Sequence, residues 1–388
     1  MLNFPEVEKK RKKRFHTETT VAEVVQEPHP IVVTEEDVSG LPLPSTSNSV
    51  VAVEAEVYLL KKELEELKKT KTVQQRFTYA MICDSDKLVL THTGLPNKSV
   101  FNYILQLCTA GEITYFLGWK VPIISHCDQL LMTLMKLKRN PTHKELAFRF
   151  QLGETTVANI INTWLHILHE TIFEGLMKNK IPSLLKNKSC LPNCFTDFTS
   201  CRIIIDCTEV YAAVPASMIK KQSMYSNYKH RYTLKGLVGV APNGVVTFLS
   251  DLYGGSTSDK KITQDCGLLS QLQSGDLILA DKGFLINDIV PEGVSVNIPP
   301  FLETPQFTRE QALRTRSIAR ARIHVERAIG RIKGYSILEF IPHNLMCYSS
   351  KVWQVCGALT NFQYPLIKEV EVFYRCGENI SEENVSSE

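Results

Sequence analysis

The sequence predicts a mixed α/β chain in two parts, a helical unit followed by a unit built on a sheet. Apolar residues recur at helical spacing up to about residue 180, whereas short β-branched runs alternate with helices from about 200 to 367. Carboxylates follow two of these runs, and another lies on a late helix. Since the three come from separate rigid elements, we expect them to form one site.

Composition narrows the class of protein. The 388 residues suffice for two or three compact units, and a net charge of +3 indicates no partner by itself. The chain has no apolar run of about 18 residues and its N-terminus is charged, so we expect an intracellular protein with no membrane span. Eleven cysteines are expected to be reduced thiols; a metal site at Cys190, Cys194, Cys201 and Cys207 is disfavoured by their spacing but stays open.

The first 50 residues are polar and are predicted to be disordered, because they cannot bury enough surface to offset the cost of ordering. They contain a basic block, for which we favour nuclear import and hence a nuclear protein. A phosphate-contacting arm and a solvated charge run are the alternatives. The block consists of Lys9, Lys10, Arg11, Lys12, Lys13 and Arg14.

Residues 52–70 predict a short coiled coil. Their apolar residues fall at alternating steps of four and three, with Glu and Lys between them, which is the pattern of a coiled-coil seam. The seam consists of Val53, Val57, Leu60, Leu64 and Leu67. Two heptads are short for stable pairing, so a homodimer and a single helix packed on its own chain both stay open.

Residues 77–180 predict a helical region. Ser99–Cys108 has helical spacing, and Leu88–Thr91 is expected to be extended. From about 127 to 177 the pattern is that of a helix-turn-helix: Thr142 with Glu145 forms a capping box, and a turn at Gly153 precedes the last helix. That helix offers polar side chains suited to DNA groove contacts, although a three-helix packing unit would look similar. The groove candidates are Thr155, Thr156, Asn159 and Asn162.

The second unit, residues 200–367, predicts strands over Arg202–Asp206, Leu277–Ala280 and Val294–Ile298. Two further runs, Thr233–Val240 and Val245–Ser250, form a hairpin through the turn Ala-Pro-Asn-Gly. Helices follow Ser258 and Thr308, the second reaching about Lys333. This is the element order of a ribonuclease H-like fold, and residues 368–388 are expected to be a flexible tail.

The candidate site consists of Asp206, Asp281 and Glu326, with Asp259 as a further acid. Taken singly, each could be a turn or capping residue. Together they predict a phosphodiester site with two divalent cations, Mg²⁺ or Mn²⁺, because such hard ions take carboxylate oxygens. On the late helix, arginines lie opposite the apolar side, which suits a DNA backbone. The residues expected to hold phosphates are Lys229, His230, Arg231, Arg322 and Lys333.

The blocks IIIDCTEVY, SDLYGGSTSDKKIT, LADKGF and TRSIARARIHVERAIGRIKGY resemble the Harbinger-related DDE superfamily endonucleases of animal transposons, and the helix-turn-helix segment resembles the one that precedes that domain. The resemblance covers about 127–367. It implies a ribonuclease H-like nuclease with two divalent metals that hydrolyses DNA and transfers strands. It matches Asp206, Asp281 and Glu326 to the catalytic acids, and gives Asp259 a supporting role.

Two departures from that family and two rival functions accompany the resemblance. Relatives often carry a zinc-binding THAP module, whereas residues 1–50 hold no Cys and only His16 and His29; Lys282 stands where relatives have Arg. The main rival is a domesticated protein that keeps the fold and binds DNA or acts as a scaffold without cutting. A glycoside hydrolase, which also uses two carboxylates, would leave the helix-turn-helix and the arginines without a role.

Overall fold

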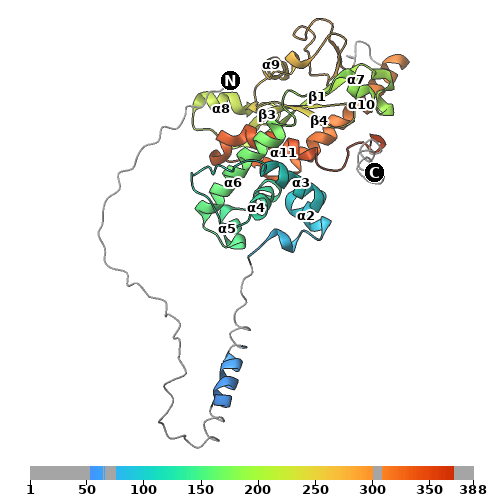
Figure 1. The fold of residues 1–388 in the computed structure, drawn as a ribbon. Helices are drawn as coiled ribbons and strands as arrows, with labels where there is room; N and C mark the ends of the chain where they lie inside the picture. The colour runs from blue at the N-terminus through green and yellow to red at the C-terminus, as the bar shows by residue number, and fades with distance from the viewer. Residues whose placement is uncertain (1–52, 64, 66–75, 300–307, 371–388) are drawn as a thin grey trace, which may run out of the picture. The chain divides into compact units, whose positions relative to one another are not determined.

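The structure, a computed structural model, describes residues 53–63, 65, 76–299 and 308–370 (Figure 1). The chain divides into two units, residues 1–75 and 76–388. In the first, residues 53–63 form a helix whose side chains are exposed, so the helical part of the predicted seam is observed. Residues 1–52, with the basic block, and Leu64 and Leu67 of the seam lie outside the described residues, as does the tail 371–388.

The second unit begins with helices. They are η1 (Tyr79–Met81), α2 (Asp86–Thr93), α3 (Lys98–Cys108), α4 (His126–Arg139), α5 (His143–Phe150), α6 (Glu154–Leu168) and the π-helical turn η2 (His169–Glu174). The expected extended stretch Leu88–Thr91 lies inside α2, so that prediction was wrong: Ser85 caps the helix by accepting the Leu88 N–H, and helical hydrogen bonding continues to Gly94.

The predicted helix-turn-helix pattern is present. The Thr142 hydroxyl accepts the Glu145 N–H and starts α5. The turn at Gln151, whose φ is 52°, ends that helix, and Gly153 is the N-cap of α6. Helix α6 therefore starts at Glu154, before the threonines. Between α3 and α4, residues 109–125 contain no helix or strand.

A mixed sheet forms the centre of the second half, which confirms the predicted fold class. Strand β1 (Cys201–Ala212) pairs antiparallel with β3 (Arg231–Val240), and in parallel with β6 (Leu277–Leu279), which pairs in parallel with β7 (Ser295–Asn297). The predicted hairpin is formed by β3 and β4 (Val246–Leu249), with Gly244 at φ +90° in its turn. The short strands are β2 (Tyr225–Ser226), β5 (Tyr253–Gly254) and β8 (Phe340–Ile341).

The remaining helices are α7 (Leu184–Lys188), α8 (Met218–Met224), α9 (Asp259–Asp265), α10 (Arg309–Lys333) and α11 (Ser349–Thr360), and the 3-10 turns are η3 (Asn193–Phe198), η4 (Leu269–Gln271), η5 (Ser336–Leu338), η6 (His343–Tyr348) and η7 (Lys368–Val370). Helix α10 begins as predicted, with a capping box between Thr308 and Gln311. Helix α9 follows its N-cap Ser258, as predicted, and ends at Asp265.

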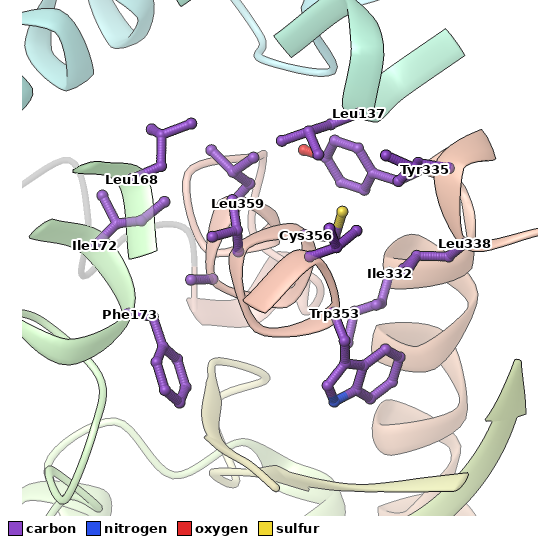
Figure 2. Packing of buried hydrophobic residues seen from close by; sticks show 14 of the residues in the cluster. Leu137, Leu168, Ile172, Phe173, Ile332, Tyr335, Leu338, Trp353, Cys356 and Leu359 are labelled. Carbon is purple, nitrogen blue, oxygen red and sulfur yellow. The ribbon is translucent and has the colours of Figure 1, made fainter. Parts of the chain in front are cut away.

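Alternation along β1 divides the core between the two faces of the sheet. Ile203 and Ile205 belong to a cluster with α9, whereas Ile204 and Val210 belong to the larger cluster with α10 and α11. The larger cluster continues without a break into the helical region: Figure 2 shows Leu137 and Leu168 on one side of α11, with Trp353 and Ile332 further along.

One contact also fixes the end of α10 directly to the helical region. The Lys138 ammonium of α4 donates to the Gly334 carbonyl at 2.8 Å and lies 5.3 Å from the centre of the buried Tyr335 ring. A protonated amine beside the last carbonyls of a helix is favourable, because these carbonyls carry partial negative charge. The helical region therefore helps to hold the long helix against the sheet.

Candidate active site

Asp206 and Asp281 are brought together by two neighbouring parallel strands. Strands β1 and β6 pair with Ile204 opposite Leu279. Asp206 and Asp281 each come two residues later, so the same register places both at one level of the two strands: Asp206 inside β1, which continues past the expected end at Asp206 to Ala212, and Asp281 just after the end of β6. Asp206 is half-buried and accepts the Cys207 N–H at 2.8 Å, whereas the side chain of Asp281 is 51% exposed.

Helix α10 adds the third acid. Its buried side chains include Val325 and Ile329, which belong to the larger core cluster with residues of β1 and β3, and Glu326 lies at the boundary of that face with its side chain 59% exposed. Burial, with smaller contributions from Asp281 and Glu326, raises the pKa of Asp206 to about 6, although Arg322 and the Cys207 N–H act in the opposite direction. Asp206, Asp281 and Glu326, which we call the acid triad, therefore form one electrostatic cluster.

Arg322 lies among these acids, although the sequence assigned it to a DNA phosphate. Its Nη1 is 3.0 Å from an oxygen of Asp281, and its Nη2 is 3.9 Å from an oxygen of Glu326, one helical turn away. The residue is only 9% exposed. The structure thus shows Arg322 as a buried cation against the acids, and its predicted contact with a DNA phosphate stays a prediction.

Asp259 belongs to a different group. At the first turn of α9 it lies 3.4 Å from the ammonium of Lys235, which is also 3.8 Å from Glu209. Glu209 accepts the Thr233 hydroxyl at 2.8 Å. Because Glu209 lies three residues after Asp206 on one strand, the two side chains point to opposite faces of the sheet. The structure therefore pairs Asp259 with Lys235, and it also places the Asp259 carboxylate beside the Cys207 thiol and near Gly283, so the supporting role expected for Asp259 stays a prediction.

Lys235 was not among the residues selected from the sequence. The register of β1 and β3 places it directly opposite Glu209, an arrangement that is favourable for opposite charges on two antiparallel strands. Only the pairing of two distant strands shows this relation. The sole signal in the sequence was a Lys within an otherwise apolar strand.

The triad has the chemistry of a divalent-cation site but not a ready-made cage. Carboxylates are the donors that Mg²⁺ and Mn²⁺ take, and a cation would relieve the repulsion felt by the half-buried Asp206. Within the described residues, however, no three His, Cys, Asp or Glu side chains are arranged to hold a metal ion. The same holds for the four cysteines considered as a metal site, which are Cys190, Cys194, Cys201 and Cys207. In the triad, the guanidinium of Arg322 lies against two of the acids.

A cationic and aromatic surface lies near the acids. Lys333, the last residue of α10, is exposed and lies within electrostatic reach of Asp206 and of Lys229. Lys229 is exposed, with its ammonium 4.6 Å from the ring centre of Tyr228, itself 81% exposed. His230 and Arg231 follow and are also exposed. These positions suit the predicted contacts with DNA phosphates.

In the helix-turn-helix, the structure corrects one predicted groove contact. Asn159 is fully buried: its side chain accepts the Leu117 N–H at 2.9 Å and donates to the Trp119 carbonyl at 3.1 Å. It therefore anchors the irregular segment 109–125 and does not face DNA. Thr155 is exposed and Thr156 is half-buried, so the N-terminal turn of α6 keeps an accessible polar surface.

Asn162 lies in a hollow between the helix-turn-helix and the C-terminal segment. This hollow, of about 580 Å³, is lined by Lys136 and Lys144 on one side and by Asn344 and Tyr348 on the other, among other residues. The C-terminal half of α6 is therefore flanked by η6 and α11, which restricts the surface that this helix presents. No helix in the described ranges is both long and apolar enough to pass through a bilayer.

Comparison with known families gives two matches. Residues 205–361 match the family model described as DDE superfamily endonuclease, and residues 125–174 match the model described as helix-turn-helix of DDE superfamily endonuclease. Asp206, Asp281 and Glu326 all lie within the first matched segment. Searches of curated proteins and of solved structures found no significant match.

Proposed function

We propose that the DDE superfamily endonuclease domain of this chain, preceded by its associated helix-turn-helix, cleaves DNA as transposases do. The clustering of Asp206, Asp281 and Glu326 around Arg322 is the observation that supports this function most directly. We also propose, from the sequence resemblance, that the substrate is transposon DNA of the Harbinger type and that cleavage is followed by strand transfer.

The reaction would depend on two divalent cations, Mg²⁺ or Mn²⁺, held by Asp206, Asp281 and Glu326. When bound, such ions supply an activated water and stabilise the negative charge of the leaving oxygen. Asp206 would contact both ions and Asp281 and Glu326 one each, since both of these acids act electrostatically on Asp206 and the Cys207 N–H holds its carboxylate. Asp281 and Glu326 come from separate rigid elements and orient their carboxylates toward the same space.

The chain's own cations would bind and orient the DNA. Lys333 lies beside the acids, and Lys229, His230 and Arg231 extend the positive surface away from them. Tyr228, with Lys229 above its ring, adds an exposed face that suits stacking or sugar contact. Thr155, Thr156 and Asn162 remain the candidate contacts of the helix-turn-helix.

A nicking assay with purified full-length chain tests the proposal. In Mg²⁺ or Mn²⁺, supercoiled DNA should be nicked by the wild type, and Asp206→Asn should abolish nicking while leaving DNA binding intact. Asp265→Asn, which changes an acid that pairs with Lys261 on the surface of α9, is the matched control and should keep activity. Nicking by Asp206→Asn at the wild-type rate would rule out the assigned site.

One observation favours a second candidate, a domesticated protein that binds DNA or acts as a scaffold without cutting. Arg322 offsets part of the negative charge of these acids without a metal ion. Under this reading the wild type binds DNA with a salt-dependent affinity but does not nick it in either metal. The same assay therefore separates the two candidates.

The location and assembly of the chain are further proposals. The basic block Lys9–Arg14 supports nuclear import, which would be lost from a fluorescent fusion in which these six residues are replaced by Gln. The exposed Val53, Val57 and Leu60 support a homodimer through the coiled coil. Replacing Val57 and Leu60 by Glu should then convert a dimer to a monomer in sedimentation equilibrium, and an unchanged mass would exclude pairing through this helix.

A further inference from the structure

Arg322 has an unusual position for a charged side chain of a surface helix. Whereas Arg322 is 9% exposed, the side chains of its partners Asp281 and Glu326 are 51% and 59% exposed. The guanidinium therefore approaches the acids from the protein interior, and the acids remain open to solvent on their other side. Its Nε is buried and has no hydrogen-bond partner.

A second buried arginine provides a comparison. Arg202 contacts both oxygens of Asp276 at 3.1–3.2 Å, and the two side chains are 7% and 3% exposed. Asp276 also accepts the Gln273 N–H, so that pair is closed and serves the fold. In contrast, Arg322 faces two solvent-accessible acids and, through space, a third, Asp206. A solvated ion can reach these acids without unfolding the chain.

We propose that Arg322 is a built-in counter-ion of the acid cluster, which competes with divalent metal for the carboxylates and must withdraw from them when metal binds. This inference rests on the proposed metal-dependent function. Its physical basis is that a guanidinium and a divalent cation on the same carboxylate oxygens repel each other at short range, most strongly in a partly buried site. Without metal, Arg322 offsets the repulsion among the acids; with metal, it opposes loading.

Withdrawal from Asp281 also gives Arg322 a role toward DNA. The freed guanidinium carries its charge beside the space that a scissile phosphate would occupy, and guanidinium binds phosphate oxygens well. When a DNA phosphate binds the Arg322 guanidinium, the guanidinium no longer competes with metal for the carboxylates. DNA binding and metal binding therefore strengthen each other. By linkage, the effect is reciprocal.

The test measures the affinity of the full-length chain for Mn²⁺ without DNA. Titration calorimetry and electron paramagnetic resonance of free Mn²⁺ provide the two measurements. Arg322→Gln should bind Mn²⁺ roughly tenfold more tightly than the wild type, the change expected when a nearby like charge is removed. Arg322→Gln should also melt at a lower temperature than the wild type in EDTA, and Mn²⁺ should raise its melting temperature by more. Arg320→Gln, which removes an exposed arginine of the same helix, should match the wild type.

Other results would overturn the proposal. If Arg322 only positions the acids, Arg322→Gln binds Mn²⁺ equally or more weakly, while the wild type still binds; the metal-dependent function then survives and the counter-ion role does not. If no chain binds Mn²⁺, both fail. Should Arg322→Gln not fold, Arg322→Met removes the charge while keeping an unbranched side chain in the buried position, and its Mn²⁺ affinity must exceed that of the wild type.

Discussion

At the scale of single residues, the environment of each polar group decides whether it belongs to chemistry or to the fold. Asp206 and Asn159 both come from patterns in the sequence that suggested function. Asp206 lies half-buried among other acids at a solvent-accessible edge, whereas Asn159 has both ends of its amide occupied within the protein. Substitution of Asp206 should therefore change metal affinity, whereas substitution of Asn159 should change the stability of the fold.

For Asp206 we expect metal affinity to depend on pH. The carboxyl has a pKa of about 6, above its ordinary value of 3.8, and it binds metal only when ionised. Mn²⁺ affinity should thus be level above about pH 7 and fall as the pH drops through 6. The metal-free chain should show the opposite trend in stability, gaining from this group as the pH falls from 6 toward 3.8. Binding titrations between pH 5 and 8 would measure the first trend; a flat profile would contradict the assignment.

For Asn159 we expect a loss of stability. Asn159→Ala leaves the partly buried Leu117 N–H and Trp119 carbonyl without partners and empties a buried side-chain position, which should cost about 2 kcal/mol of unfolding free energy in urea titrations. Thr155→Ala is the matched change on the exposed end of α6 and should alter stability by less than about 0.5 kcal/mol. If that end contacts DNA, only the threonine variant combines normal stability with weaker DNA binding. Equal stability of the two variants would refute the structural role of Asn159.

At the scale of elements, the contact between α10 and η3 aligns the helix that carries Glu326. His324 is 6% exposed, lies 3.4 Å from the Cys194 sulfur and stacks on the Phe195 ring at a centroid distance of 6.1 Å. Burial, assisted by Arg327, lowers the pKa of His324 to about 4, while Glu369 acts in the opposite direction. This histidine is therefore neutral in the fold at physiological pH.

This burial predicts an acid-sensitive helix contact. As the pH falls from 6.5 to about 4, the unfolded chain takes up a proton that folded His324 refuses, so stability declines by at most about 3 kcal/mol. His324→Gln cannot take up that proton and should flatten this part of the stability profile. Denaturant titrations at several pH values compare the two chains. A wild-type slope retained in the Gln variant would show that other groups dominate.

At the scale of the whole second unit, the helical region and the sheet share one core. Trp353 of α11 is fully buried, and a Cβ added at Gly236 of β3 would lie 3.0 Å from its ring. On its other side, α11 packs against residues of α4 and α6 (Figure 2). The helix-turn-helix is thus packed against the half that contains the sheet through a continuous apolar layer.

Loss of Trp353 should weaken both halves together. Trp353→Ala removes a large buried ring and should lower the free energy of unfolding by about 3–5 kcal/mol. Because the core is continuous, far-UV circular dichroism and tryptophan fluorescence should report one shared transition. Phe148→Ala, which removes an exposed aromatic side chain of α5, is the control and should have little effect. Two separate transitions would mean that the halves unfold independently.

Much of the fold follows from local patterns. Apolar alternation and turn chemistry predicted the β3–β4 hairpin, the capping box predicted the start of α10 at Thr308, and Thr142 predicted the start of α5. These features depend on residues within a few positions of one another. Leu88–Thr91 failed because the cap at Ser85 and the continuing helical bonds outweighed a β-branched, leucine-rich run.

By itself, the sequence determined the type of fold and indicated Asp206, Asp281 and Glu326 as candidate site residues, because a carboxylate after an apolar run and one on an amphipathic helix are visible in one dimension. The tertiary structure decided which cation those acids share, which acid pairs with Lys235, and which asparagine is buried. The contacts of Asn159, Asp259 and Asp281 come from segments distant in the chain. Burial and charge pairing are sums over such neighbours, and only the folded packing specifies them.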